Sequence, residues 1–193
     1  VSDLPEPIPR FHLIVRSRRA RHIAGMDDKP HSHRLRIGRR SEPGACYLLT
    51  TCCDGRAPLL SDARAAEIVL ETLHWLDGNE RMELFAAVAM PDHVHFIGAL
   101  RHVPLDGLMH SLKGCSRQRI NRKLGRCGRF WQPGYHDRAL RSEQSVDAAI
   151  RYCLQNPVRA GLAVDFREYP HCWSKWRDDP AFVGAPSLKA SRG

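Results

Sequence analysis

The stretch from Leu84 to Leu100, LFAAVAMPDHVHFIGAL, decides the fold because two strand-forming runs meet in it at a tight turn. Residues 84–90 predict one strand, and the dipeptide Pro91-Asp92 predicts the turn. Residues 93–100 predict a second strand that folds back on the first. The stretch therefore predicts a pair of antiparallel strands near the middle of a domain.

Alternation along the second of these strands separates two kinds of side chain. His93 and His95 share one face of the strand, and Val94 and Phe96 share the other. We expect the two apolar side chains to pack on helices and the two imidazoles to lie on the opposite, open face of the sheet.

The sequence on either side of this pair predicts two more strands and three helices. The expected strands cover residues 46–52, 84–90, 93–100 and about 138–140, and the expected helices cover about 62–77, 105–124 and 143–156. The order is β-α-β-β-α-β with one further helix. It predicts a ferredoxin-like α+β fold: an antiparallel sheet with helices on one face, plus an additional helix.

Composition bounds the domain organisation and the partner. Of the 193 residues we expect 1–40 to be a basic, disordered tail, 41–180 to be one domain and 181–193 to be a flexible tail. The net charge of +9 favours a polyanionic partner such as nucleic acid, although a merely basic soluble protein has the same charge.

Cysteine usage and hydropathy predict the compartment. The seven cysteines are odd in number and form no C-x-x-C pair, which favours a reducing cytosol over a disulfide framework. No apolar run approaches the roughly 20 residues of a membrane helix, and Leu13 to Val15 is too short a run for a secretory signal. We therefore expect a cytoplasmic protein with no membrane contact.

The paired histidines are candidate metal ligands. Imidazoles two residues apart on one strand face can converge on a divalent ion, and a third ligand would still leave positions for a substrate oxygen. Structural histidines with satisfied hydrogen bonds are the alternative interpretation of His93 and His95. A second H-x-H pair, His31 and His33, lies in the Arg-rich tail, and we interpret it as solvated.

The last predicted helix carries a candidate nucleophile. Its apolar stripe follows helical spacing: Val146, Ala149, Ile150, Cys153 and Leu154. Tyr152 lies outside the stripe, and Asn156 lies on the same side one turn later. A phenol can attack phosphorus and an amide oxygen can bind a metal. The alternative is a tyrosine that packs at the edge of the core.

A rival tyrosine and a basic helix complete the candidates. Tyr135 lies in the loop 130–137, FWQPGYHD. An aromatic ring in such a loop usually packs or stacks on a base. Tyr135 is also a rival to Tyr152 as the nucleophile. No acidic residue occurs in 108–130, which favours a phosphate-binding surface over an ordinary solvated helix face. The candidate DNA-binding cations are Lys113, Arg117, Arg119, Arg122, Lys123 and Arg126.

Three segments together resemble one known family. MPDHVH at 90–95, FWQPGYHD at 130–137 and RYCLQNPVRAGL at 151–162 are similar to the REP-associated tyrosine transposases, a branch of the single-tyrosine HUH transposases. The resemblance runs from about Arg34 to Trp176 and so covers most of the chain. The Arg-rich extension before it is longer than the family domain needs, and this leaves its role in DNA binding open.

The resemblance implies a function and a set of roles. It implies that His93, His95 and Asn156 hold a divalent ion, Mg²⁺ or Mn²⁺, and that Tyr152 on a catalytic helix is the nucleophile. The implied reaction is metal-dependent nicking and strand transfer on a single-stranded DNA hairpin, a REP-like palindrome, through a 5′-phosphotyrosine. A monomer and a homodimer are both compatible with it, and so are an active and a domesticated transposase.

Two other functions stay open from the sequence. A non-catalytic protein could bind single-stranded nucleic acid on an RRM-like open sheet. A metal-dependent hydrolase that uses water would cleave DNA without forming an adduct. The DNA recognition sequence and the physiological metal cannot be read from the sequence.

Overall fold

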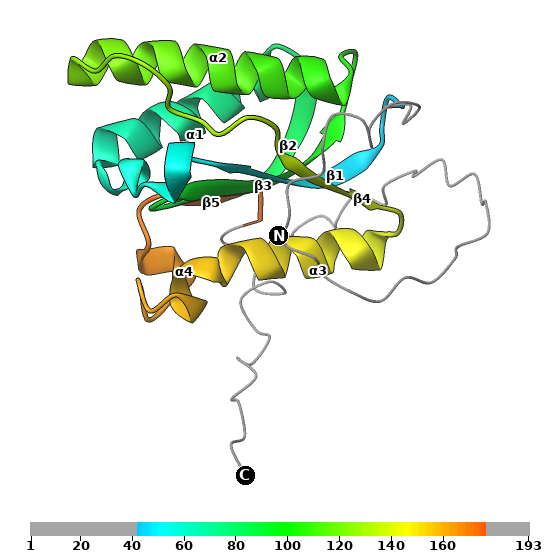
Figure 1. The fold of residues 1–193 in the computed structure, drawn as a ribbon. Helices are drawn as coiled ribbons and strands as arrows, with labels where there is room; N and C mark the ends of the chain where they lie inside the picture. The colour runs from blue at the N-terminus through cyan, green and yellow to red at the C-terminus, as the bar shows by residue number, and fades with distance from the viewer. Residues whose placement is uncertain (1–41, 177–193) are drawn as a thin grey trace, which may run out of the picture.

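The computed structural model describes residues 42–176. The predictions for the tails at 1–40 and 181–193, and for His31 and His33, lie outside the described residues. Within the described range the chain forms one sheet with helices on both of its faces (Figure 1).

The sheet is antiparallel and has five strands in the order β4-β1-β3-β2-β5. The strands are β1 (Cys46–Cys52), β2 (Met82–Met90), β3 (His93–Leu100), β4 (His136–Leu140) and β5 (Cys172–Ser174). The four strands expected from the sequence are present in the ferredoxin-like order. The short edge strand β5, which pairs with β2, was not expected.

The helices follow the predicted order. They are α1 (Ala63–Gly78), α2 (Leu105–Leu124), α3 (Glu143–Leu154) and α4 (Asn156–Arg159), with short 3-10 turns η2 (Asp54–Arg56), η3 (Leu59–Ser61) and η4 (Phe166–Glu168). The expected last helix ends two residues early, and α4 follows it after Gln155. No helix in the described part of the chain is long and apolar enough to cross a bilayer.

Local signals fix where these helices begin and end. The Asp62 carboxylate accepts a hydrogen bond from the backbone N–H of Arg64 and caps α1. Ser142 and Ser145 form a reciprocal capping box at the start of α3. Gly125 ends α2 with a left-handed φ of 61°, which glycine adopts without strain.

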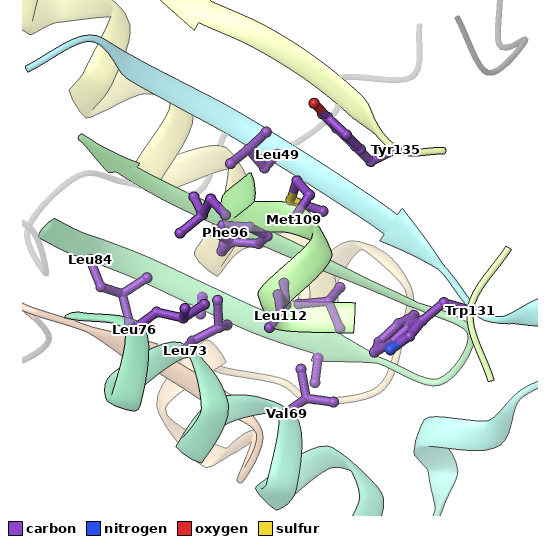
Figure 2. Packing of buried hydrophobic residues seen from close by; sticks show 14 of the residues in the cluster. Leu49, Val69, Leu73, Leu76, Leu84, Phe96, Met109, Leu112, Trp131 and Tyr135 are labelled. Atoms are coloured by element: carbon purple, nitrogen blue, oxygen red, sulfur yellow. The ribbon is translucent and has the colours of Figure 1, made fainter. Parts of the chain in front are cut away.

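One face of the sheet packs on α1 and α2. Val94 and Phe96 of β3 are fully buried there, as the alternation predicts. Figure 2 shows the side chains from the sheet and the two helices that interlock in this layer. Labelled members include Leu49, Val69, Leu73, Leu76, Leu84, Met109 and Leu112.

The opposite face is not open, and the expectation that it would be free for a ligand is wrong. α3 lies across it (Figure 1), with its predicted apolar stripe packed on buried side chains of β2 and β3 such as Phe85, Val88 and Ile97. The physical reason is that an amphipathic helix must bury its apolar stripe, and this sheet face is the apolar surface available to it. The end of this face that carries Thr50, His93 and His95 is polar.

Gly98 in β3 supplies a test of this packing. A Cβ at Gly98 would lie 2.4 Å from Met82 Cε and 2.6 Å from the backbone oxygen of Glu83. Because the carbonyl cannot move aside, we expect Gly98→Ala to lower the free energy of unfolding by about 1–3 kcal/mol. Urea denaturation followed by circular dichroism measures it.

The matched control is Gly114→Ala in α2. A Cβ there meets nothing within 4 Å, and alanine is favoured over glycine inside a helix by roughly 0.5–1 kcal/mol. We expect the control to be neutral or stabilising. Equal stability of the two variants would show that β2 and β3 are not tightly packed at Gly98.

Candidate active site

The two histidines of β3 meet at their Nε2 atoms. These atoms lie 3.1 Å apart, and the rings are edge to face with centroids 4.6 Å apart. Both side chains project from the sheet face that α3 covers, opposite Val94 and Phe96. The strand alternation therefore predicted their common face correctly.

The other nitrogen of each ring is held by an oxygen. His93 Nδ1 donates to the Asp92 carboxylate at 2.5 Å, and His95 Nδ1 is hydrogen-bonded to the Thr50 hydroxyl at 2.7 Å. Thr50 lies directly opposite His95 in the antiparallel pairing of β1 with β3. These bonds fix the ring orientations and turn both Nε2 atoms toward one point.

The site favours a neutral imidazole beside an ionised carboxylate. Burial, followed by the nearby charges of His93 and Arg56, lowers the pKa of His95 to about 3. Partial burial raises the pKa of Asp92, but hydrogen bonds from His93 and Arg56 outweigh burial and hold that pKa below its ordinary value. At neutral pH His95 thus keeps a lone pair for a ligand.

Arg56 extends this chain of contacts. Its guanidinium lies 3.3 Å from the Asp92 carboxylate. Its φ of 56° is a left-handed conformation that residues other than glycine rarely adopt, and such strain is common near functional sites. Because Arg56 contacts Asp92 and Asp92 in turn bonds to His93, the charge of Arg56 lies close to the imidazole pair.

Tyr152 brings a phenol to the same sheet face. It projects from α3 outside the buried stripe, 40% exposed, and its ring centroid is 6.1 Å from that of His95. The Cys153 thiol next to it donates to the backbone oxygen of His95 at 3.7 Å, which ties α3 to β3 at this point. A phenol and a paired-imidazole strand thus lie side by side.

Asn156 begins α4 one turn after Tyr152. Its Nδ2 donates to the backbone oxygens of Tyr152 and Cys153. The amide nitrogen is thereby directed to the helix end, which leaves the amide oxygen as its group for a ligand. Among the described residues, neither imidazole hydrogen-bonds to Asn156.

The donor set suits a divalent cation that accepts nitrogen and oxygen. Within residues 42–176 no group of three or more His, Cys, Asp or Glu side chains is placed to hold a metal ion. Two converging imidazole nitrogens are present, however, and the Asn156 oxygen is of the chemical type that would complete such a set. By donor type the three residues fit a divalent cation, and of these donors the structure brings the two imidazole nitrogens together.

The predicted DNA-binding cations lie across the sheet from the imidazoles, on the α2 side. Three of them have partners inside the protein. Lys113 donates to the backbone oxygens of Gln132 and Gly134, Arg119 pairs with Glu71, and Arg126 lies over the Phe130 ring.

The other three cations of this set, Arg117, Arg122 and Lys123, are exposed. Arg117 lines a groove of about 670 Å³ along α2, together with His110 and Gln118. Arg122 and Lys123 border a second groove, between α1 and α2. These three side chains are the ones still available for phosphate.

Tyr135 is not brought to the site. Its ring is 8% exposed and packs in the core on the α1 and α2 side of the sheet, near Leu49 and Met109 (Figure 2). An aromatic ring buried there has no exposed face for a base and does not share the sheet face of the imidazoles. Of the roles considered for Tyr135, the structure shows the packed ring.

Sequence reasoning missed four residues that contact the histidines, Tyr152 or one another: Thr50, Arg56, Asp92 and Arg159, whose Cζ lies 4.6 Å from the centroid of the Tyr152 ring. Asp92 could have been found, because it immediately precedes His93. Arg159 was detectable as a cation two turns after Tyr152. Thr50 and Arg56 depend on strand register and loop conformation, for which the sequence carries no simple signal.

Two solved structures are similar to this chain. A solved structure of a REP-associated tyrosine transposase bound to a REP hairpin matches with a TM-score of 0.57 and 19% identity, over 69% of this chain and 79% of that chain. A putative transposase from Deinococcus radiodurans R1 matches with a TM-score of 0.45 and 25% identity, over 65% of this chain and 97% of that one.

The family follows from the sequence match. The model of the IS200-like transposases matches residues 44–156, more than half of the chain, and the chain belongs to this family. It is therefore a DNA-processing protein of the transposase class. Comparison with the curated proteins gives no match.

Proposed function

We propose that this transposase is a single-stranded DNA endonuclease and strand transferase of the REP-associated type, with Tyr152 as its nucleophile. The observation that carries the proposal is the position of the exposed Tyr152 ring, 6.1 Å from the His95 ring on one sheet face. The proposed substrate is a hairpin DNA with a single-stranded flank, because the fold match is to a protein bound to a REP hairpin.

The proposed step is a transfer of the phosphoryl group. The Tyr152 oxygen forms a bond to phosphorus while the bond from phosphorus to the 3′-oxygen breaks. The phenol proton passes to solvent and the departing 3′-oxygen takes up a proton. The products are a 5′-phosphotyrosine and a free 3′-hydroxyl, and the reverse reaction joins strands.

The residues that would hold a divalent ion, Mg²⁺ or Mn²⁺, are His93, His95 and Asn156. When bound, such an ion offsets negative charge on the phosphate oxygens. Asp92 and Thr50 hold the two rings with their Nε2 atoms 3.1 Å apart, so the nitrogens need little rearrangement. Tyr152 stands beside them with its ring partly exposed to an incoming strand.

A labelled hairpin with a single-stranded flank tests the proposal directly. After incubation with Mn²⁺, a denaturing gel should show a protein-linked DNA band. Cleavage without that band would support a hydrolase that uses water, and binding without cleavage would support a binding module. The structure favours the enzyme over the RRM-like module, because α3 covers the face that such a module needs open.

The α2 surface is the proposed contact for the DNA backbone. Its exposed cations lie on the far side of the sheet from Tyr152, and we propose that the strand passes the sheet edge near the loop at Gln132. That loop joins the two regions: Gln132 accepts from Lys113 of α2 and donates its backbone N–H to Cys52 of β1. Cys52 pairs with His93.

We expect the combined Ala substitution of Arg117, Arg122 and Lys123 to weaken hairpin binding about tenfold or more. Each lost phosphate contact lowers the slope of log affinity against log salt by about 0.9, so the slope should fall by about 2–3 in magnitude. Fluorescence anisotropy across a range of NaCl concentrations measures both.

The control for this experiment is Arg101→Ala. Arg101 is an exposed arginine that pairs with Glu83 beyond the end of β3 opposite to the histidines. It should leave the salt slope unchanged. An unchanged slope in the triple variant would show that DNA does not follow α2.

A further inference from the structure

We propose that Arg159 is a substrate-binding residue of this site, which contacts a non-bridging oxygen of the scissile phosphate while it holds the Tyr152 ring in place. This inference rests on the proposed phosphotyrosine chemistry. It assigns to Arg159 a role beyond the set of the two histidines, the tyrosine and the asparagine.

The backbone places Arg159 beside the nucleophile. After α3 the chain passes through Gln155, whose backbone is right-handed helical, into the single turn of α4. In this turn Pro157 is buried and the backbone N–H of Arg159 donates to the Gln155 oxygen at 2.9 Å. From this turn the side chain reaches back, and its Cζ lies 4.6 Å from the centroid of the Tyr152 ring. This is a cation–π contact with the proposed nucleophile.

The guanidinium of Arg159 has no carboxylate partner among residues 42–176. Nearby arginines differ in this respect, since Arg56 pairs with Asp92 and Arg167 pairs with Asp165. Arg159 is also exposed. An unpaired cation next to the nucleophile is thus available for an anion from solution.

Arg159 is close to the imidazoles as well as to the phenol. The ring that its guanidinium covers is itself 6.1 Å from the His95 ring. The Tyr152 ring is therefore near both His95 and Arg159. A phosphate that approaches Tyr152 would come near these same groups.

The chemistry of guanidinium suits both parts of the proposed role. Its planar face stacks on an aromatic ring, and its N–H groups donate in pairs to phosphate oxygens. As the Tyr152 oxygen attacks phosphorus and the 3′-oxygen departs, negative charge grows on the non-bridging oxygens, and a fixed donor stabilises that charge. A lysine ammonium can supply charge but not the planar stack.

The test combines Arg159→Ala, Arg159→Lys and Arg159→Gln with DNA that carries one sulfur at either non-bridging position of the scissile phosphate. Single-turnover formation of the protein–DNA band is timed for each enzyme and DNA. We expect Arg159→Ala to lower the rate at which the protein–DNA band forms about 100-fold, as for the loss of one donor to a charged transition state. Arg159→Lys should lower this rate less. Melting temperature should stay at the wild-type value, and hairpin affinity should fall far less than the rate, because the donor acts mainly on charge that grows in the transition state.

The measurement specific to a phosphate contact is the difference in rate between the two DNAs that carry sulfur at one or the other non-bridging position. Wild type should react more slowly with sulfur at one of the two positions, and Arg159→Ala and Arg159→Gln should lose that difference. Arg167→Ala is the matched control and should behave as wild type. A slower Arg159→Ala that keeps the wild-type discrimination would overturn the phosphate contact, and an unchanged rate would overturn the inference altogether.

Failure of this inference is distinguishable from failure of the proposed function. If wild type forms no band on any of the DNAs, the phosphotyrosine proposal fails and the inference fails with it. If wild type forms the band and every Arg159 variant does so equally well, only the role of Arg159 is lost.

Discussion

Tyr152→Phe is expected to abolish the protein-linked DNA band while the hairpin still binds with wild-type affinity. Phenylalanine keeps the ring that faces His95 and Arg159 but removes the only atom that can bond to phosphorus. Because Tyr152 is 40% exposed and lies outside the buried stripe of α3, the substitution should leave stability within about 0.5 kcal/mol of wild type. A denaturing gel and fluorescence anisotropy measure the two properties.

Tyr135→Phe is the matched control for this experiment. Tyr135 is buried on the other side of the sheet, so its variant should form the band at the wild-type rate if it folds. If Tyr152→Phe still cleaved DNA and Tyr135→Phe did not, Tyr135 and not Tyr152 would be the nucleophile. A band from both single variants would point to a nucleophile outside these two residues.

His95→Ala is expected to lower the affinity for Mn²⁺ at least 100-fold and to abolish the band. The substitution removes one of two Nε2 donors that stand 3.1 Å apart, and His93 alone cannot replace the pair. Titration calorimetry with MnCl₂ on the free protein measures the affinity without reference to activity. Removal of metal with EDTA should abolish the wild-type band, and added Mn²⁺ should restore it.

His102→Ala is the control for the metal experiment. His102 is exposed and follows β3 at the end remote from His93 and His95. Its variant should bind Mn²⁺ as wild type does. If His95→Ala bound Mn²⁺ as tightly as wild type, the ion would have to be held elsewhere.

The elements and the faces of individual side chains could be predicted because they depend on local periodicity. A period of two placed His93 and His95 opposite Val94 and Phe96, and helical spacing separated Tyr152 from the buried stripe of α3. Helix caps and glycine stops located the ends of α1 and α2 to within about two residues.

The relations between elements could not be predicted because periodicity carries no information about them. The contact of Thr50 with His95 needs the register of β1 on β3, which the turn sequences do not specify. The spacing in α2 shows which side of that helix is buried, but it does not show that its cations lie across the sheet from the histidines. Helical spacing in α3 likewise does not identify the sheet face that its stripe covers.

The two halves of the site are anchored by different forces. The turn before His93 is fastened by directional bonds, from the N–H of Cys53 to the oxygen of Asp92 and from the N–H of Leu60 to the oxygen of Pro91. The position of Tyr152 is instead held by the packing of the buried apolar stripe of α3 on the sheet. A helix held in this way can detach as a cooperative unit before the sheet itself unfolds. A mild denaturant should therefore produce a protein that keeps its imidazole pair yet has lost the phenol beside it.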